Sequence, residues 1–316
     1  MAALVLTIAY VFGLVALGFG AGTTRLLKPD VGDALTDFVN VIALPVLMFR
    51  TMTSADFGAA APWSLWSAYF LSAAIIWALG QLVTSKVFRR ERKAAIIGGL
   101  TASYSNLVLL GLPFIQSAFG HDGVSILSLI LAVHLPLMLG VSAIQFALAE
   151  REEGQRVDAW REVANFLKAL AGNKLVIGIL AGLAWRLSGL PLPSLVERMV
   201  DTLAATAGPL ALFGMGMGLL RFGISANFMP ALTLALMKLF LMPALMTLAV
   251  ILFGLPPLAA KVALVSAAMP VGVNPYLFAV KFGTGHALSS NALTLGTVMS
   301  VVSTGIWLAI ATALFG

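Results

Sequence analysis

The fold of this chain is decided by two stretches, TASYSNLVLLGLPF at residues 101–114 and SAAMPVGVNPYLF at residues 266–278. Each lies in the middle of a hydrophobic segment long enough to cross a bilayer. Each also carries Gly, Pro and Asn where a spanning helix usually has Leu and Val. A helix that is broken at membrane depth leaves backbone groups unpaired, which is tolerated only where they line a protein or water-filled cavity. A matched pair of breaks therefore indicates the binding site of a secondary transporter.

The composition is typical of a membrane protein. Hydrophobic residues make up 60% of the chain, charged residues only 10%, and the mean hydropathy is +1.01. A soluble domain has about 25% charged residues, so we expect an all-α polytopic membrane protein. The chain has no cysteine, which excludes disulfides and thiolate metal sites; we expect neither a metal nor a cofactor. The first hydrophobic segment begins almost at Met1 without a basic region, so we expect an uncleaved first span.

We expect ten transmembrane helices, because a spanning helix needs about 20 apolar residues. They are predicted at residues 3–22, 34–53, 63–84, 94–118, 123–149, 173–189, 195–220, 229–253, 258–281 and 287–315. The long polar segment 150–172 has an apolar rhythm and both charge signs, which favours a cytoplasmic amphipathic helix at the membrane interface. It separates a first five-helix repeat, residues 1–149, from a second, residues 173–316.

The two halves carry matching residues at a nearly constant offset. Three residues of the second span recur 164 residues later in the seventh: Asp37, Pro45 and Phe49 match Asp201, Pro209 and Phe213. A Phe-Gly pair follows both interrupted spans, at residues 119–120 and 282–283. An odd number of spans in each repeat inverts the second repeat relative to the first. We therefore predict a 5+5 inverted repeat in which the broken spans 4 and 9 cross near the midplane.

Lys and Arg are distributed unequally over the connections between the spans. Fourteen of the nineteen lie on the side that holds the connections 1–2, 3–4, 5–6, 7–8 and 9–10. By the positive-inside rule this side is cytoplasmic. We expect a bacterial-type inner-membrane protein with both termini on the non-cytoplasmic side. The net charge of +6 is explained by this topology, and we expect no nucleic-acid partner.

In the second stretch, Asn274 and Pro275 have the pattern of a helix start, with Asn as the N-cap and Pro as the first helical residue. A half-helix that begins at mid-membrane presents unpaired N–H groups and a partial positive charge, which favour an anion. Pro270 and Gly272 help to end the preceding half-helix. We take Asn274, Pro275 and the adjacent Tyr276 as substrate-binding candidates.

In the first stretch, the corresponding candidates are Ser105, Asn106, Gly111 and Pro113. The Asn106 amide offers a ligand both a donor and an acceptor. For either stretch alone, a proline kink is an adequate explanation, because neighbouring helices can satisfy the backbone of a kinked helix. Two kinks with Asn and Gly at matched positions favour the transport interpretation.

Spans 2 and 7 supply apolar candidates. Pro45, Met48 and Phe213 are expected to flank the crossing and form its apolar wall, with ordinary helix packing as the alternative. The run GMGMG at residues 214–218 follows no strand, and small residues at a helix interface explain it better than a nucleotide loop does.

Ionisable residues inside a membrane span are functional candidates by default. Lys238 could balance the charge of a substrate, or snorkel toward a wet cavity. His134 could titrate in a proton-coupled cycle, or be an ordinary buried histidine. Asp37 and Asp201 are expected near helix starts, where a carboxylate favours the helix dipole; a proton or cation role is the alternative. The three histidines are scattered, and no H-E-x-x-H or G-x-S-x-G motif occurs, so we do not expect an enzyme.

The chain resembles the auxin efflux carrier family, which includes bacterial malonate-type carriers and the plant PIN proteins. The resemblance covers nearly the whole chain. It rests on the ten-span plan and on four stretches: SNLVLLGLP at 105–113, NPY at 274–276, PVLMF at 45–49 and PLALF at 209–213.

This resemblance implies a scaffold of spans 1, 2, 6 and 7 and a transport domain of spans 3–5 and 8–10, often in a homodimer. It implies a small organic carboxylate as substrate, with Asn106 at the first crossover and Asn274 and Pro275 at the second. We therefore expect a transporter of a malonate- or auxin-like anion that works by alternating access, through an elevator or rocking motion. The alternatives are a sodium- or proton-coupled carrier of bile-acid-like or other organic solutes, a membrane receptor and a channel.

Overall fold

The computed structural model describes residues 2–54, 62–150, 164, 168, 171–221 and 228–316. These residues fold into helices joined by short connections, together with one isolated antiparallel bridge. The all-α prediction is therefore confirmed for the described part of the chain. Most of the predicted amphipathic segment 150–172 lies outside the described residues.

The chain divides into two compact units, each assembled from several stretches of sequence. Unit 1 comprises residues 1–62, 107–132 and 171–221. Unit 2 comprises residues 63–106, 133–170 and 222–316. Each unit therefore draws on both halves of the chain, and no half folds as a separate body.

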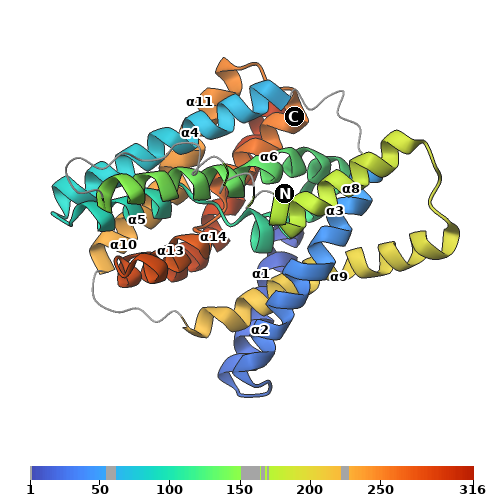
Figure 1. Ribbon diagram of the computed structural model, residues 1–316, viewed down its shortest axis with the longest axis horizontal. Helices are drawn as coiled ribbons and strands as arrows, with labels where there is room; N and C mark the ends of the chain where they lie inside the picture. The colour runs from blue at the N-terminus through green and yellow to red at the C-terminus, as the bar shows by residue number, and fades with distance from the viewer. Residues whose placement is uncertain (1, 55–61, 151–163, 165–167, 169–170, 222–227) are drawn as a thin grey trace. The chain divides into compact units, whose positions relative to one another are not determined.

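The helices of unit 1 include short π-helical segments and one 3₁₀ turn, all of which we label η. They are α1 (Ala2–Thr23), α2 (Pro29–Phe38), η1 (Val39–Ala43), α3 (Leu44–Ser54), η3 (Leu107–Gly111), the first part of α6 (Leu112–Glu150), α8 (Lys174–Ser188), α9 (Ser194–Gly218) and the 3₁₀ turn η4 (Leu219–Arg221). Figure 1 shows the course of these helices by colour along the chain.

The helices of unit 2 are likewise divided into short segments joined end to end. They are α4 (Pro62–Leu82), η2 (Val83–Val87), α5 (Arg92–Ser103), the second part of α6, α10 (Phe228–Leu236), η5 (Met237–Leu241), α11 (Met242–Leu252), α12 (Pro257–Ala268), α13 (Asn274–Phe282) and α14 (His286–Phe315). The half-helices α5 and α12 form the core of this unit, since nearly all of their residues are buried.

Seven helical stretches in the described chain are long and apolar enough to cross a bilayer. This supports a multi-pass membrane protein, although it is fewer than the ten predicted spans. The difference has a physical cause, because two predicted spans are interrupted and a third, α8, has only 15 residues. In addition, one stretch of 43 residues, 107–149, joins the end of predicted span 4 to span 5.

Both predicted interruptions are present in the structure. The first separates α5, which ends at Ser103, from η3, which begins at Leu107. The second separates α12, which ends at Ala268, from α13, which begins at Asn274. We call residues 104–106 the first break and residues 269–273 the second break. The half-helices that precede them, α5 and α12, are both 12 residues long.

Three of the π-helical segments lie just before a proline. η1 is followed two residues later by Pro45, η3 by Pro113 and η5 by Pro243. A proline inside a helix lacks the N–H group and clashes with the carbonyl one turn earlier. A widened turn relieves this conflict without ending the helix, and such bulges are frequent at functional sites. Pro45 and Pro113 are candidates in the sequence, whereas neither Pro243 nor the π-helical geometry is predicted from it.

Unit 1 is held together by close glycine contacts between helices. α1 packs on α9, and α3 packs on α8. Gly18 lies so close to α9 that an added Cβ would be 2.1 Å from the Phe213 carbonyl oxygen, and an added Cβ on Gly182 would be 2.5 Å from the Phe49 carbonyl oxygen. The two pairs correspond at an offset of 164 residues, from 18 to 182 and from 49 to 213. The two halves of the chain therefore contribute equivalent contacts to unit 1.

Candidate functional site: the paired helix breaks of unit 2

The two breaks pair with each other inside unit 2. The Asn106 N–H donates to the Pro270 carbonyl at 2.8 Å, and the Gly272 N–H donates to the Tyr104 carbonyl at 3.1 Å. Ser105 and Val271 face each other between these two bonds in an antiparallel bridge. A broken helix has to satisfy its freed backbone groups within the protein, and here each break satisfies the other.

Gly272 is required by the close approach of Tyr104. An added Cβ at Gly272 would lie 2.8 Å from the Tyr104 Cδ1 atom, well inside van der Waals contact. The Tyr104 ring is therefore seated directly on the backbone of the second break. Its hydroxyl accepts a hydrogen bond of 2.5 Å from the Asn274 side-chain amide. The two breaks are thus joined by side chains as well as by backbone.

The predicted helix-start pattern of Asn274 and Pro275 is wrong in detail. Asn274 is the first residue of α13 and Pro275 the second, while Val273 occupies the N-cap position without a side-chain cap. The Val273 carbonyl accepts the N–H of Tyr276 at 3.0 Å. The Asn274 side chain is drawn away from the helix N-terminus because it donates to Tyr104.

A second polar contact supports the first break from the side of α4. The Tyr69 hydroxyl donates to Ser105 Oγ at 3.1 Å. Both residues are buried, as is Asn106 at 5% exposure. His134 on α6 lies beside the two tyrosines, with ring centroids 4.7 Å from Tyr104 and 5.6 Å from Tyr69.

His134 is buried in this aromatic setting and interacts with the backbone of Ser105. Neither of its ring nitrogens has a hydrogen-bond partner of full geometry in the described part of the chain. His134 is therefore a buried neighbour of the first break.

Lys238 reaches the end of the half-helix that precedes the second break. The residue lies in η5, its side chain is completely buried, and Nζ donates to the Ala267 carbonyl at 2.6 Å. Ala267 belongs to the last turn of α12, so the lysine satisfies one of the carbonyls that a helix C-terminus leaves open. Snorkelling to a wet surface does not describe this side chain.

The apolar candidates Pro45, Met48 and Phe213 lie in unit 1, as do Gly111 and Pro113. Gly111 and Pro113 follow the first break, and Met48 is buried, with its sulfur 3.4 Å from Ser128 Oγ. The Pro45 backbone lies close to a glycine of α8, and the Phe213 backbone lies close to a glycine of α1. The structure therefore groups seven of the predicted residues in unit 2: Ser105, Asn106, His134, Lys238, Asn274, Pro275 and Tyr276.

The placement of Asp37 and Asp201 near helix starts is wrong. The helix that contains Asp37 begins at Pro29, and α9 begins at Ser194, so each carboxylate lies in the second or third turn. The dipole effect falls off within the first turn. Asp201 instead accepts a hydrogen bond from Arg50 Nε at 2.5 Å, and Glu197 lies 3.2 Å from the same guanidinium.

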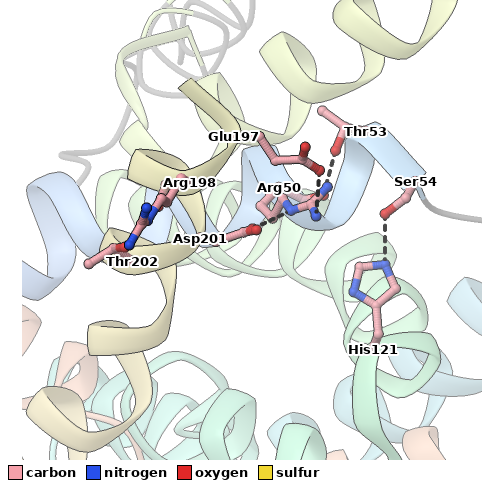
Figure 2. Close-up of polar contacts among 8 residues, drawn as sticks. All are labelled: Arg50, Thr53, Ser54, His121, Glu197, Arg198, Asp201 and Thr202. Atoms are coloured by element: carbon pink, nitrogen blue, oxygen red, sulfur yellow. Dashed lines mark hydrogen bonds and ion pairs between the residues drawn. The ribbon is translucent and has the colours of Figure 1, made fainter. Parts of the chain in front are cut away.

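This Arg50 cluster joins α3 to α9 in unit 1. Figure 2 shows the Arg50 side chain between Glu197 and Asp201, with the contact between Ser54 and His121 nearby. The sequence analysis missed the cluster. A signal was available, because Arg50 ends one predicted span and Asp201 lies near the beginning of another on the same predicted side. Exposed ion pairs of this kind contribute about 0–1 kcal/mol each, so the cluster orients the helices more than it stabilises them.

The paired breaks bring together amide, hydroxyl and imidazole groups in an apolar interior, where a hydrogen bond is electrostatically stronger than in water. Within the described residues, no three side chains of the His, Asp and Glu type come together to hold a metal ion.

Comparison with known proteins finds similar sequences over nearly the full length of the chain. A family described as "Membrane transport protein" matches residues 3–308. A protein of Rhizobium meliloti (strain 1021) named "Putative malonate transporter" is 25% identical over 92% of this chain and 91% of its own length. Auxin efflux carrier component 8 of Arabidopsis thaliana is 24% identical over 91% of this chain and 92% of its own length.

A third relative is the lysosomal cholesterol signaling protein of Mus musculus, which is 23% identical over 92% of this chain. The match covers only 35% of the mouse protein, so this chain spans about a third of that relative. The family match extends over nearly every residue, and it includes both breaks and both units. The chain therefore belongs to the membrane transport protein family, the family of the auxin efflux carriers, whose members are membrane transporters and not enzymes.

Proposed function

We propose that this protein is a secondary transporter that moves a small organic anion across the inner membrane by alternating access, with the paired breaks at its substrate site. The observation that carries the proposal is the mutual pairing of the two breaks by backbone bonds and by the Asn274–Tyr104 contact. Interrupted helices that meet at membrane depth place polar groups where a substrate can be bound.

The anion is favoured by the polar groups that lie at the breaks. The amides of Asn106 and Asn274 lie in or directly after a break, and the first turn of α13 presents the positive end of its dipole. Two relatives are named for malonate and auxin, which are both carboxylates. A small mono- or dicarboxylate is therefore the substrate class that we propose.

The proposed architecture is ten spans in a 5+5 inverted repeat, with residues 1–149 and 173–316 as the repeats. The equivalent contacts of Gly18 with Phe213 and of Gly182 with Phe49 support it. So do the equal lengths of α5 and α12 and the positive φ angles of Gly120 and Gly283, which are 62° and 67°. Each of these two glycines ends the helical segment that follows a break.

We further propose that unit 2 carries the substrate and that unit 1 is the scaffold of a homodimer. Unit 1 contains spans 1, 2, 6 and 7 of the expected scaffold, and unit 2 contains spans 3, 8, 9 and 10 of the expected transport domain. Residues 107–132, from spans 4 and 5, join unit 1. The charge distribution supports an orientation with both termini on the non-cytoplasmic side.

A second candidate is a carrier of a larger, less charged organic solute, coupled to protons or sodium. Two observations favour the less charged solute: the Lys238 amino group is engaged with a backbone carbonyl and so is not offered to a substrate carboxylate, and one relative is named for cholesterol signaling. The experiment below separates the two candidates.

The test is counterflow in proteoliposomes that contain the purified protein. Vesicles are preloaded with malonate, succinate or indole-3-acetate, and entry of the same radiolabelled compound is followed. We expect a transient overshoot with at least one carboxylate, lost in Asn106→Ala and in Asn274→Ala and kept in Asn40→Ala, an exposed asparagine of η1. Flux without overshoot would indicate a channel. Flux of sterol-like compounds alone would favour the second candidate.

A further inference from the structure

Lys238 is a buried basic residue that has no carboxylate partner among the described residues. Its side chain has 0% exposure, and it is in neither of the ion pairs that the structure shows among described residues. No Asp or Glu occurs between residues 202 and 316, so none lies near Lys238 along the chain. Within unit 2, Glu91 accepts a hydrogen bond from Thr284 at an exposed position. A buried charge needs compensation from its surroundings.

The compensation available to Lys238 is the C-terminus of a half-helix. The last four carbonyls of a helix have no partner within it and together carry a partial negative charge. In α12 the Ser266 carbonyl accepts the Met269 N–H at 3.4 Å, and the Ala267 carbonyl accepts the lysine at 2.6 Å. Ser266 Oγ, in the same turn, is buried and has no hydrogen-bond partner in the described chain.

Open carbonyls at the end of an interrupted helix are the groups with which secondary transporters coordinate coupling cations such as sodium. In this protein the ammonium group of Lys238 occupies that position. We propose that Lys238 is a tethered cation that takes the place of a mobile coupling cation at the second break, and that the protein therefore works without sodium. This role of Lys238 rests on the proposed transport function. Its test below, however, does not depend on the substrate.

The test measures the apparent melting temperature of the purified protein from the fluorescence of its six tryptophans. Chloride salts of sodium, lithium, potassium, methylammonium and choline are compared at constant ionic strength. A cation that binds only the folded state raises the melting temperature by mass action. We expect the wild-type protein to melt at the same temperature in all five salts.

Lys238→Ala should melt at a lower temperature in choline chloride and regain stability with at least one of the small cations, because the freed carbonyls and Ser266 Oγ become available to it. Lys238→Arg keeps a tethered cation and should be indifferent to the salt. Lys261→Ala is the matched control. Lys261 lies on α12, the helix whose end Lys238 contacts, and donates to the Gly316 backbone oxygen in an exposed hydrogen bond.

Two results would overturn the proposal: a specific stabilisation of the wild-type protein by sodium, or a folded Lys238→Ala variant that is indifferent to every cation. If Lys238→Ala does not fold, the melting temperatures of the wild-type protein in the five salts still show whether it binds sodium. A counterflow assay of the wild type with sodium inside, outside or absent completes the test. Loss of all carboxylate flux would contradict the proposed function, whereas flux that requires sodium would contradict only the role of Lys238.

Discussion

The two half-helices that lead into the breaks are alike in backbone and different in charge. α5 and α12 have the same length, and Ala102 of α5 corresponds to Ala267 of α12 at an offset of 165 residues. Against Ala102 lies Gly80 of α4, and against Ala267 lies Lys238 of η5. The end of the first half-helix is thus closed by tight packing, and the end of the second by an ammonium group.

The local hydrogen bonds follow this difference. Near the end of α5, Thr101 and Ser103 donate their hydroxyl groups to carbonyls of their own helix, at 2.7 Å and 2.9 Å. These neutral bonds bring no charge to the first break. At the second break the group within hydrogen-bond distance of the helix end is the amino group of a basic side chain. The comparison teaches that two half-helices of equal length can lead into similar breaks while only one of them ends against a basic side chain.

The largest expected effect comes from removing the charge at the second break. Lys238→Ala deletes a long buried side chain and leaves the Ala267 carbonyl without its donor. We expect a loss of about 3–5 kcal/mol in stability, from the cavity and the unsatisfied acceptor together. The measurement is the melting temperature in detergent without added small cations. A loss below about 1 kcal/mol would show that the two half-helix ends do not differ in the way described.

The next effect tests the tight packing at the first break. An added Cβ at Gly80 would lie 2.8 Å from the Ala102 Cβ and 3.0 Å from the Gly98 carbonyl oxygen. Gly80→Ala should therefore destabilise the protein by about 1–3 kcal/mol through overpacking. Gly13→Ala is the control, since an added Cβ there meets nothing within 4 Å. That substitution should stabilise α1 by about 0.5–1 kcal/mol; equal melting temperatures for the two variants would argue against close packing at α5.

A third pair of variants tests the contact between the breaks themselves. In Gly272→Ala the new methyl group collides with the Tyr104 ring, and we expect a loss of about 1–3 kcal/mol together with reduced transport. In Gly296→Ala the methyl group would meet Val271 at an ordinary 3.6 Å. The second variant should keep full transport. If both variants transport normally, the seating of Tyr104 on the second break is unimportant.

The smallest expected effect separates the two tyrosines. Tyr104→Phe removes the acceptor for Asn274, and Tyr69→Phe removes the donor to Ser105. Each should cost about 1 kcal/mol of stability, the usual net value of a hydrogen bond. Because Asn274 belongs to the proposed substrate site, Tyr104→Phe should also change the apparent KM for the carboxylate. Tyr69→Phe should change that KM by less in the same counterflow assay, because Tyr69 lies on α4, outside both breaks, and acts on the site through Ser105.

Local chemistry made the positions of the breaks predictable. Proline, glycine and asparagine within long apolar segments interrupt helices for reasons that are present in the residues themselves, so both breaks occur where they were expected. The pairing of particular groups was not predictable in this way. That Asn274 turns toward Tyr104 and Lys238 toward Ala267 depends on residues 170 and 29 positions away in the chain.

The errors have a similar origin. Asp37 was assigned to a helix start because the predicted span begins at residue 34, whereas α2 begins at Pro29. For α9 the predicted start at residue 195 agrees with the observed start at Ser194, and the error was to count a residue two turns further on, Asp201, as part of the helix start. Its true partner, Arg50, is 151 residues away. The π-helical segments were also missed, because a proline indicates that the helix must adapt but not that it adapts by widening one turn.

The most direct test of the central claim, that the paired breaks bind the substrate, uses the absence of cysteine from the chain. Val273→Cys places one thiol in the second break, at a half-buried residue whose side chain makes no cap. Thr24→Cys in unit 1 is the control. In proteoliposomes, the carboxylate that gives counterflow should slow maleimide labelling of Val273→Cys and leave Thr24→Cys unaffected. Unchanged labelling of Val273→Cys at saturating substrate, in a variant that still transports, would contradict the account.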